Sequence, residues 1–306
     1  ICSGENFKKT ILEALPNFSE RQYLGEPEGR DTMNAVGLTA AVISIKDPNA
    51  VFAVLTADHV IRPQRVIKEA IKTGFEIVEE DSNSFVTFGI KPTSPATGYG
   101  YIERGSLYKK DSNVFFAKRF VEKPNKEKAL SYLEQGTFDW NSGMFIFQAE
   151  KLLETIKKYH PDTYSGLLEI QKKWDSPDKK KTLKEVYPRL KKVSIDYGIM
   201  EPLSKEKNED SIINIPVGVE WLDIGSWSSY SELMERDHLG NSSNARFESI
   251  NSRGICAVSD NKEHLITTID CEDLVIVNTK SASLVCPLKS VQKVKDLVQI
   301  INSSDQ

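Results

Sequence analysis

Residues 51–59 read Val-Phe-Ala-Val-Leu-Thr-Ala-Asp-His, and residues 221–227 read Trp-Leu-Asp-Ile-Gly-Ser-Trp. Each segment places one aspartate, Asp58 or Asp223, at the end of a strand-like stretch, the second following the apolar run 212–216. A carboxylate at the carboxyl end of a buried strand lies where open α/β sheets bind their ligands. Two carboxylates that converge from distant segments can hold a hard cation such as Mg²⁺ and leave room for phosphate oxygens. The two segments therefore predict an α/β fold with a metal and phosphate site at the edge of its sheet.

The pattern around these segments alternates between strands and helices, as α/β folds do. The continuous apolar run 51–57 is bounded by polar residues and indicates a buried, parallel strand. Further strands are expected over 85–90, 114–121 and 144–148. Helices are expected over 5–15, 31–46, 63–73 and 126–135, with helical structure throughout 149–190.

The composition changes after about residue 245, where short apolar runs replace the β–α alternation. These runs cover 254–258, 274–277 and 283–286, and a last helix is expected over 291–301. We therefore predict a large domain over 1–240 and a small C-terminal β module with a terminal helix over 241–306.

The bulk composition excludes several classes of protein. The 306 residues are 39% hydrophobic and 27% charged, with a net charge of −4 and no basic tail. Nucleic acid and anionic membrane are therefore not expected partners, and no apolar run approaches the roughly 20 residues of a membrane span. Four cysteines, Cys2, Cys256, Cys271 and Cys286, lack metal-type spacing and are expected to be free thiols in a reducing cytoplasm.

The dipeptide Glu122-Lys123 stands between an apolar run and Pro124. A carboxylate fixed there can accept two sugar hydroxyls, while the lysine supplies a point charge for phosphate. An exposed ion pair is the competing interpretation of Glu122 and Lys123. For Asp58 the competing interpretation is that it caps the following turn. His59 is expected to be structural, because Mg²⁺ prefers oxygen ligands.

Three loops add candidate binding groups. Gly98 and Gly100 flank an aromatic residue, and glycine lets backbone N–H groups approach a ligand closely. Asn141 places an amide on a tight bend before the strand 144–148. Ordinary turns are the competing interpretation for both loops. The loop 26–32 enters a helix, whose N-terminus attracts phosphate or a base edge, although its acidic residues argue against phosphate.

Seven segments in this order resemble the sugar-1-phosphate nucleotidyltransferase family, and most closely its mannose-1-phosphate guanylyltransferases. They are EPEGRDT (26–32), LTADH (55–59), FGIKPTSPATGYGYIE (88–103), RFVEKP (119–124), WNSGMF (140–145), IDYGIME (195–201) and WLDIGSW (221–227). The resemblance implies a nucleotide-binding, Rossmann-like fold of GT-A type, with a mixed sheet flanked by helices and a small C-terminal β module. It also implies an Mg²⁺-dependent enzyme that forms GDP-mannose and pyrophosphate from GTP and mannose 1-phosphate.

The resemblance also implies roles for particular residues. As catalytic residues, Asp58 and Asp223 would hold Mg²⁺ and Lys123 would contact the sugar phosphate. The positions matching the hexose site are Gly98, Gly100, Glu122, Asn141 and Asp196. Those matching the segment near the guanine are Glu26, Gly29 and Arg30.

One feature of the family has no counterpart here. Its Gly-rich opening loop, with an Arg and a Lys that grip the triphosphate, matches nothing in a chain that opens Ile1-Cys2-Ser3-Gly4. We expect this loop and the first sheet strand to lie upstream of Ile1. The 306-residue chain alone should then express poorly and release little pyrophosphate, whereas an upstream-extended chain should be soluble and active. A nucleotidyltransferase for another sugar 1-phosphate and a non-catalytic sugar-nucleotide-binding relative are the alternatives, and the oligomeric state is open, with a homodimer as one candidate.

Overall fold

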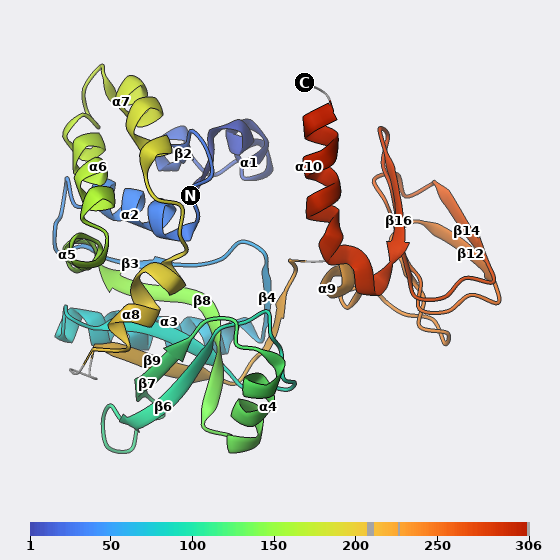
Figure 1. Cartoon of the computed structure of the whole chain (residues 1–306), viewed down its shortest axis with the longest axis horizontal. Coiled ribbons are helices and arrows are strands. Elements are labelled where there is room, and N and C mark those ends of the chain that lie inside the picture. Colours follow the sequence, from blue (N-terminus) through green and yellow to red (C-terminus); the bar gives the residue numbers. More distant parts are fainter. Residues whose placement is uncertain (207–210, 226, 305–306) are drawn as a thin grey trace. The chain divides into compact units, whose positions relative to one another are not determined.

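The computed structural model describes residues 1–206, 211–225 and 227–304 (Figure 1). The fold divides into two compact units. The first, here called the sheet unit, comprises Ile1–Thr56 and Arg62–Val219, and the second, the C-terminal unit, comprises Ala57–Ile61 and Glu220–Gln306. Asp58 and Asp223 therefore belong to the same unit, although they lie far apart in sequence.

A six-stranded mixed sheet forms the centre of the sheet unit. Its strands are ordered β3 (Val51–Val54), β8 (Phe138–Gln148), β5 (Phe85–Ile90), β9 (Ile212–Val217), β7 (Phe115–Val121) and β6 (Tyr101–Leu107). β5 and β9 are parallel, whereas β8 runs antiparallel to both β3 and β5. The predicted mixed α/β sheet flanked by helices is therefore confirmed.

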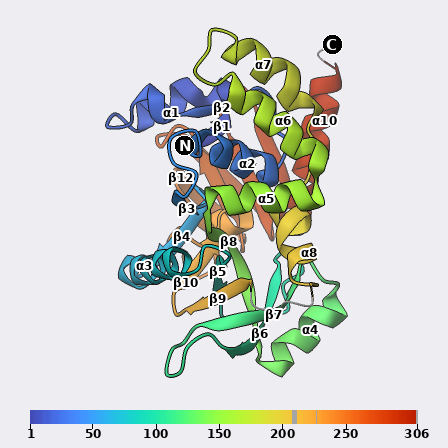
Figure 2. The same cartoon turned by 90° about the vertical axis from the view of Figure 1, so that its left-hand side faces the viewer.

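Helices cover both faces of this sheet (Figure 2). Alternate residues of a strand point to opposite faces. Ile146 packs against Gly74 of α3 (Gln64–Glu80), where an added Cβ would lie 2.7 Å from the isoleucine. Phe145 and Phe147 belong instead to the main core, together with apolar residues of α2 (Thr32–Ile43), α5 (Ala149–Tyr159) and α6 (Pro161–Lys172). The glycine thus lets α3 approach the sheet closely.

Short elements complete the sheet unit. They are β1 (Cys2–Gly4) paired with β2 (Leu24–Glu26), the α-helices α1 (Lys8–Ala14), α4 (Lys126–Gln135), α7 (Lys179–Val186) and α8 (Glu201–Leu203), the 3-10 helices η1 (Glu5–Phe7), η2 (Glu20–Gln22) and η3 (Tyr187–Arg189), and the π-helix η4 (Asp196–Met200). The bounds of α4 follow from its caps. The Asn125 side chain accepts the Lys128 N–H at 3.0 Å, and Gly136 ends the helix with a φ of 67°.

The run 51–57 differs from its prediction as a buried, parallel strand. β3 ends at Val54, its four residues are half-buried, and it pairs antiparallel with β8 at the end of the described sheet. An apolar run does not encode the direction of the strand with which it pairs. Here the neighbouring elements cover only part of the surface of β3. β6 was not among the predicted strands, although a turn before a strand was one interpretation of the loop that precedes it. The predicted helical stretch 149–190 divides into α5, α6, α7 and η3.

The C-terminal unit is a coil of short strands. A ribbon of β4 (His59–Arg62) and β10 (Glu220–Asp223) is followed by α9 (Trp227–Ser231), β11 (Ser242–Ser243), β12 (Arg246–Ile250), β13 (Cys256–Ser259), β14 (Leu265–Ile269), β15 (Leu274–Asn278), β16 (Ser283–Pro287), η5 (Leu288–Lys293) and α10 (Val294–Ser304). β11, β13 and β15 form one parallel array and β12 and β14 another, so successive turns of the coil stack. The predicted C-terminal β module is confirmed. None of the helices in the described part of the chain combines the length and the apolar character needed to cross a membrane.

Candidate active site

Two aspartates and a histidine meet in the C-terminal unit. One ligand atom each from Asp58, His59 and Asp223 lie within 4.8 Å of one another. Asp58 directly precedes β4, Asp223 ends β10, and the Ile224 N–H donates to the Asp58 carbonyl at 2.9 Å. The expected placement at the ends of buried sheet strands is wrong, because these residues belong to the separate β4–β10 ribbon. The expected convergence of the two carboxylates is nevertheless present.

His59 contacts Asp58 from a buried position. Its side chain is 7% exposed, and its Nε2 lies 3.8 Å from the Asp58 Oδ1. The Trp221 indole N–H donates to His59 Nδ1 at 3.1 Å, and the rings meet edge to face with centroids 5.0 Å apart. Burial lowers the pKa of His59, against the opposing effect of Asp58 and Asp223. The imidazole is therefore packed in a site where burial disfavours its charged form.

The donors of this cluster fit a hard divalent cation. Asp58 and Asp223 offer carboxylate oxygens, which Mg²⁺ prefers, and the Asp58 side chain is 60% exposed. A hydrated ion can therefore reach it. Ser226, which belongs to the same motif as Asp223, lies outside the described residues.

Glu122, in the sheet unit, is a buried carboxylate with one open acceptor. It follows β7, its side chain is 7% exposed, and its Oε1 lies 3.1 Å from the Lys123 Nζ. Its Oε2 is buried and has no hydrogen-bond partner within the described structure. Burial, helped by the nearby Asp196, raises the pKa of Glu122 to about 7 against the opposing charge of Lys123. A hydroxyl donor from a ligand would satisfy the open oxygen.

Lys123 adopts a backbone conformation that is rare for its residue type. Its φ is 44°, in the left-handed region, and it directly precedes Pro124. Strain of this kind costs roughly 1–3 kcal/mol and concentrates at functional sites. Burial lowers the pKa of Lys123, but its pairing with Glu122 outweighs this and leaves the pKa raised. No sequence pattern had indicated the left-handed conformation.

Asn141 hydrogen-bonds to two other predicted hexose-binding residues. Its N–H donates to the Gly100 carbonyl at 2.8 Å, and its Nδ2 donates to Asp196 Oδ1 at 2.8 Å. A Cβ on Gly100 would lie 2.4 Å from Glu122 Oε2, so a larger residue would require that carboxylate to shift. Gly98 is exposed, with nothing within 4 Å of an added Cβ, and lies outside this cluster.

Tyr187 holds the predicted guanine-contacting Glu26. Glu26 ends β2, and its Oε1 accepts the hydroxyl of the fully buried Tyr187 at 2.5 Å. Sequence reasoning missed Tyr187, because it lies 161 positions away and no local motif marks it.

The other residues of the predicted guanine segment lie in the loop before α2. Gly29 is exposed, and Arg30 pairs with Glu28 at 2.6 Å. The Ile195 N–H donates to Thr32 Oγ1 at 2.9 Å. The start of α2 therefore lies directly beside the segment that carries Asp196.

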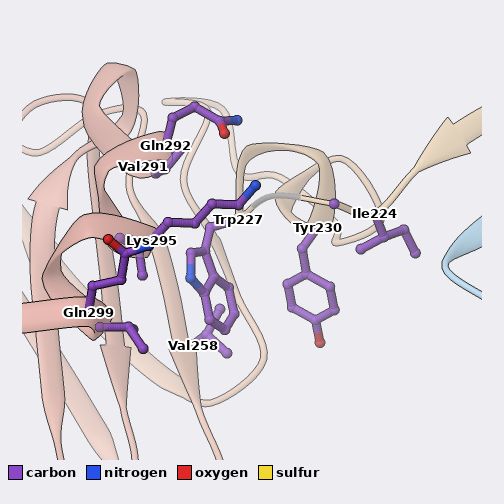
Figure 3. Close-up of a pocket in the computed structure, with 11 residues that line it drawn as sticks. Ile224, Trp227, Tyr230, Val258, Val291, Gln292, Lys295 and Gln299 are labelled. Atoms are coloured by element: carbon purple, nitrogen blue, oxygen red, sulfur yellow. The ribbon is translucent and has the colours of Figure 1, made fainter. Parts of the chain in front are cut away.

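An apolar pocket of about 830 Å³ also occurs in the C-terminal unit (Figure 3). Trp227 and Tyr230 line it from α9, and Val291 and Lys295 line it from the η5–α10 segment. Ile224 and Gly225, which directly follow Asp223, also line it, so the pocket adjoins the segment that carries the aspartate site.

Known proteins match the chain over nearly its whole length. It is 35% identical to a mannose-1-phosphate guanylyltransferase from Salmonella montevideo and 36% identical to one from Escherichia coli K12. These alignments cover 98% and 99% of the chain but only 62% and 63% of the relatives, so the chain spans about three fifths of their length.

Solved structures show the same likeness. A Thermus thermophilus structure described as mannose-1-phosphate geranyltransferase has a TM-score of 0.79 at 26% identity, covering 98% of this chain and 83% of that one. A Helicobacter pylori mannose-6-phosphate isomerase structure has a TM-score of 0.59 at 27% identity, covering 73% and 83%.

Two family profiles match separate parts of the chain. Residues 248–300 match the mannose-phosphate isomerase/GMP-like beta-helix domain, in agreement with the stacked parallel strands of the C-terminal unit. Residues 5–239 match the nucleotidyl transferase profile. The chain therefore belongs to the nucleotidyl transferase family.

Proposed function

We propose that this protein forms GDP-mannose and pyrophosphate from GTP and mannose 1-phosphate. The observation that carries the proposal is the Glu122–Lys123 pair, which sets a buried open carboxylate oxygen beside an ammonium group. A sugar phosphate needs both, an acceptor for hydroxyls and a charge for phosphate. The names of the aligned relatives support mannose and guanosine as the sugar and base.

The reaction is an in-line displacement at the α-phosphorus of GTP. A phosphate oxygen of mannose 1-phosphate forms the new P–O bond, and the bond to the β-phosphate bridging oxygen breaks. Pyrophosphate leaves with the electron pair. The nucleophile is already an anion, so it needs no strong general base, and catalysis consists of positioning and charge compensation.

The chain's residues divide this work. Lys123 reduces the repulsion between two anionic reactants, while Glu122 and Asn141 orient the hexose. Glu26, held by Tyr187, can accept the N–H donors of the guanine edge. Asp58 and Asp223 would hold Mg²⁺, which when bound offsets negative charge on phosphate oxygens.

The wider assignments follow the same proposal. We assign 1–240 to the catalytic domain and 241–306 to the β module, and we place the enzyme in the cytoplasm. Its partners are then GTP and mannose 1-phosphate, without nucleic acid or membrane.

Pyrophosphate release tests the function. The purified protein is given GTP, ATP or UTP with mannose 1-phosphate or glucose 1-phosphate. We expect the GTP and mannose 1-phosphate pair to give the highest kcat/KM and EDTA to stop the reaction. Omitting the sugar phosphate is the control.

Preference for another pair would overturn the substrate assignment. GDP-mannose binding by calorimetry without turnover on any pair would instead identify a non-catalytic relative.

A further inference from the structure

We infer that Trp221 and His59 form a positioning pair that orients Asp58 for the divalent cation. The inference rests on the proposed function, in which Asp58 and Asp223 hold that cation. Nothing in the sequence motif marks Trp221 for this role, and His59 was expected to be structural only.

Hydrogen-bond chemistry fixes the tautomer of His59. An indole N–H can only donate, so His59 Nδ1, which lies 3.1 Å from the Trp221 Nε1, must accept. A neutral imidazole in this position therefore carries its proton on Nε2. That nitrogen lies 3.8 Å from Asp58 Oδ1, so the proton-bearing nitrogen is the one near the carboxylate.

The same tautomer excludes His59 as a ligand. A metal bound to Nε2 of a neutral imidazole would require the proton on Nδ1, which would then oppose the indole N–H at 3.1 Å. The cation is left with the carboxylate oxygens of Asp58 and Asp223. An oxygen-only set suits Mg²⁺, and partners behind the ligands commonly set their orientation.

The contrast in burial shows what the pair contributes. The Asp58 side chain is 60% exposed, whereas the His59 side chain is 7% exposed and meets the Trp221 ring at 79°. An exposed aspartate loses rotamer freedom when it binds an ion. Contact with a fixed imidazole restricts Asp58 beforehand. Because Trp221 lies on β10 with Asp223, the pair also ties the segments of both ligands together.

Mn²⁺ affinity, measured by electron paramagnetic resonance of the free ion, tests the inference. Trp221→Phe keeps every ligand atom and removes the indole donor. We expect it to weaken Mn²⁺ binding by about 10-fold or more, within the roughly 10- to 100-fold typical of such partners. Trp174→Phe, whose ring packs against Lys179 in the sheet unit, is the matched control and should bind Mn²⁺ like the wild type.

His59→Gln covers the case in which Trp221→Phe does not fold. Glutamine keeps an N–H donor near the Nε2 position but has no imidazole nitrogen to bind metal. His59→Leu, which has no donor, is measured beside it. A Mn²⁺ affinity of His59→Gln within about threefold of the wild type supports the positioning role. A loss as large as that of His59→Leu contradicts it. Unchanged or stronger Mn²⁺ binding by folded Trp221→Phe would also overturn the inference.

A histidine ¹H–¹⁵N spectrum gives a readout independent of activity. The chain has four histidines, and His59→Gln identifies the signal of His59. We expect the Nε2–H tautomer in the wild type and a mixture in Trp221→Phe, and an Nδ1–H tautomer in the wild type would refute the inference.

If the wild type binds Mn²⁺ and is active while Trp221→Phe behaves identically, only the positioning role fails. If turnover does not depend on a divalent ion, the proposed metal site and the positioning role fail together.

Discussion

Replacing Glu122 with glutamine should change how the stability of the ligand-free protein depends on pH. Burial raises the pKa of Glu122 to about 7 from the ordinary 4.5, Asp196 adds to the rise, and Lys123 opposes it. The folded state therefore holds this proton more tightly than the unfolded state. The resulting stability is fully present below pH 4.5 and is lost as pH rises through about 7. Glutamine cannot ionise, so this dependence disappears in the variant.

The size of the effect follows from the shift. A rise from 4.5 to about 7, at 1.36 kcal/mol per unit, corresponds to about 3 kcal/mol. The side chain is only 7% exposed, so solvent screening reduces this value little. Relative to the glutamine variant, the wild type should lose about that much free energy of unfolding between about pH 4.5 and pH 8.

Urea unfolding of both proteins at several pH values measures the difference directly. The glutamine variant serves as the reference for all other titrating groups, because these are shared by the two chains. A difference in unfolding free energy that stays constant from about pH 5 to pH 8 would refute the assignment of Glu122 as a buried, destabilised carboxylate. Saturating mannose 1-phosphate should shrink the pH dependence, since its hydroxyls would donate to the open Oε2.

Four further substitutions test the individual assignments. Asp223→Asn should lower kcat by about 10³-fold, because it removes a charge that holds a cation whose stabilisation of the transition state is worth several kcal/mol. The double variant with Asp58→Asn should be little worse. Normal turnover at limiting Mg²⁺ would contradict this prediction. Lys123→Ala should weaken mannose 1-phosphate binding by roughly 1.5–3 kcal/mol while calorimetric GTP binding stays unchanged; the opposite pattern would place the lysine at the triphosphate. Gly100→Ala should raise KM for the sugar phosphate, since its Cβ would meet a carboxylate oxygen at 2.4 Å, and an unchanged KM would show that the neighbour moves freely. Glu26→Gln should lower kcat/KM for GTP by about 10-fold, as expected for one lost charge-assisted hydrogen bond, and should lower it less for ATP. Equal losses for the two nucleotides would show that Glu26 does not recognise the base.

Sequence reasoning anticipated local contacts where short motifs carry both chemistry and geometry, while the binding roles of these residues stay predictions. Glu122 and Lys123 are adjacent, so their pairing needed only a fixed strand end, and the loop glycine Gly100 was identified from its motif. The contact of Asn141 with Asp196 was implied only by family resemblance, because 55 positions separate them.

What the sequence could not show depends on long-range packing. The apolar run 51–57 carried no information on the direction of its partner, so β3 was wrongly expected to be parallel and buried. No local sequence pattern indicated that Asp58 and Asp223 lie at the β4–β10 ribbon and not in the six-stranded sheet. Tyr187 hydrogen-bonds to Glu26 across 161 positions, and Trp221 hydrogen-bonds to His59 across 162. No periodic sequence pattern extends over such separations.

The carboxylate of Asp58 and that of Glu122 differ in exposure in a way that favours a cation at only one of them. Mg²⁺ gives up its water reluctantly and usually keeps several molecules in its shell. Asp58, 60% exposed, can take such a hydrated ion, whereas Glu122, 7% exposed and already paired with Lys123, would require the ion to shed its shell beside an ammonium group. A carboxylate whose pKa is about 7 also carries its full charge for only part of the time at neutral pH. Sugar hydroxyls are neutral donors and do not meet this penalty. We therefore expect the carboxylate of Asp58 to favour a cation and that of Glu122 to favour sugar hydroxyls, because the two side chains differ in burial.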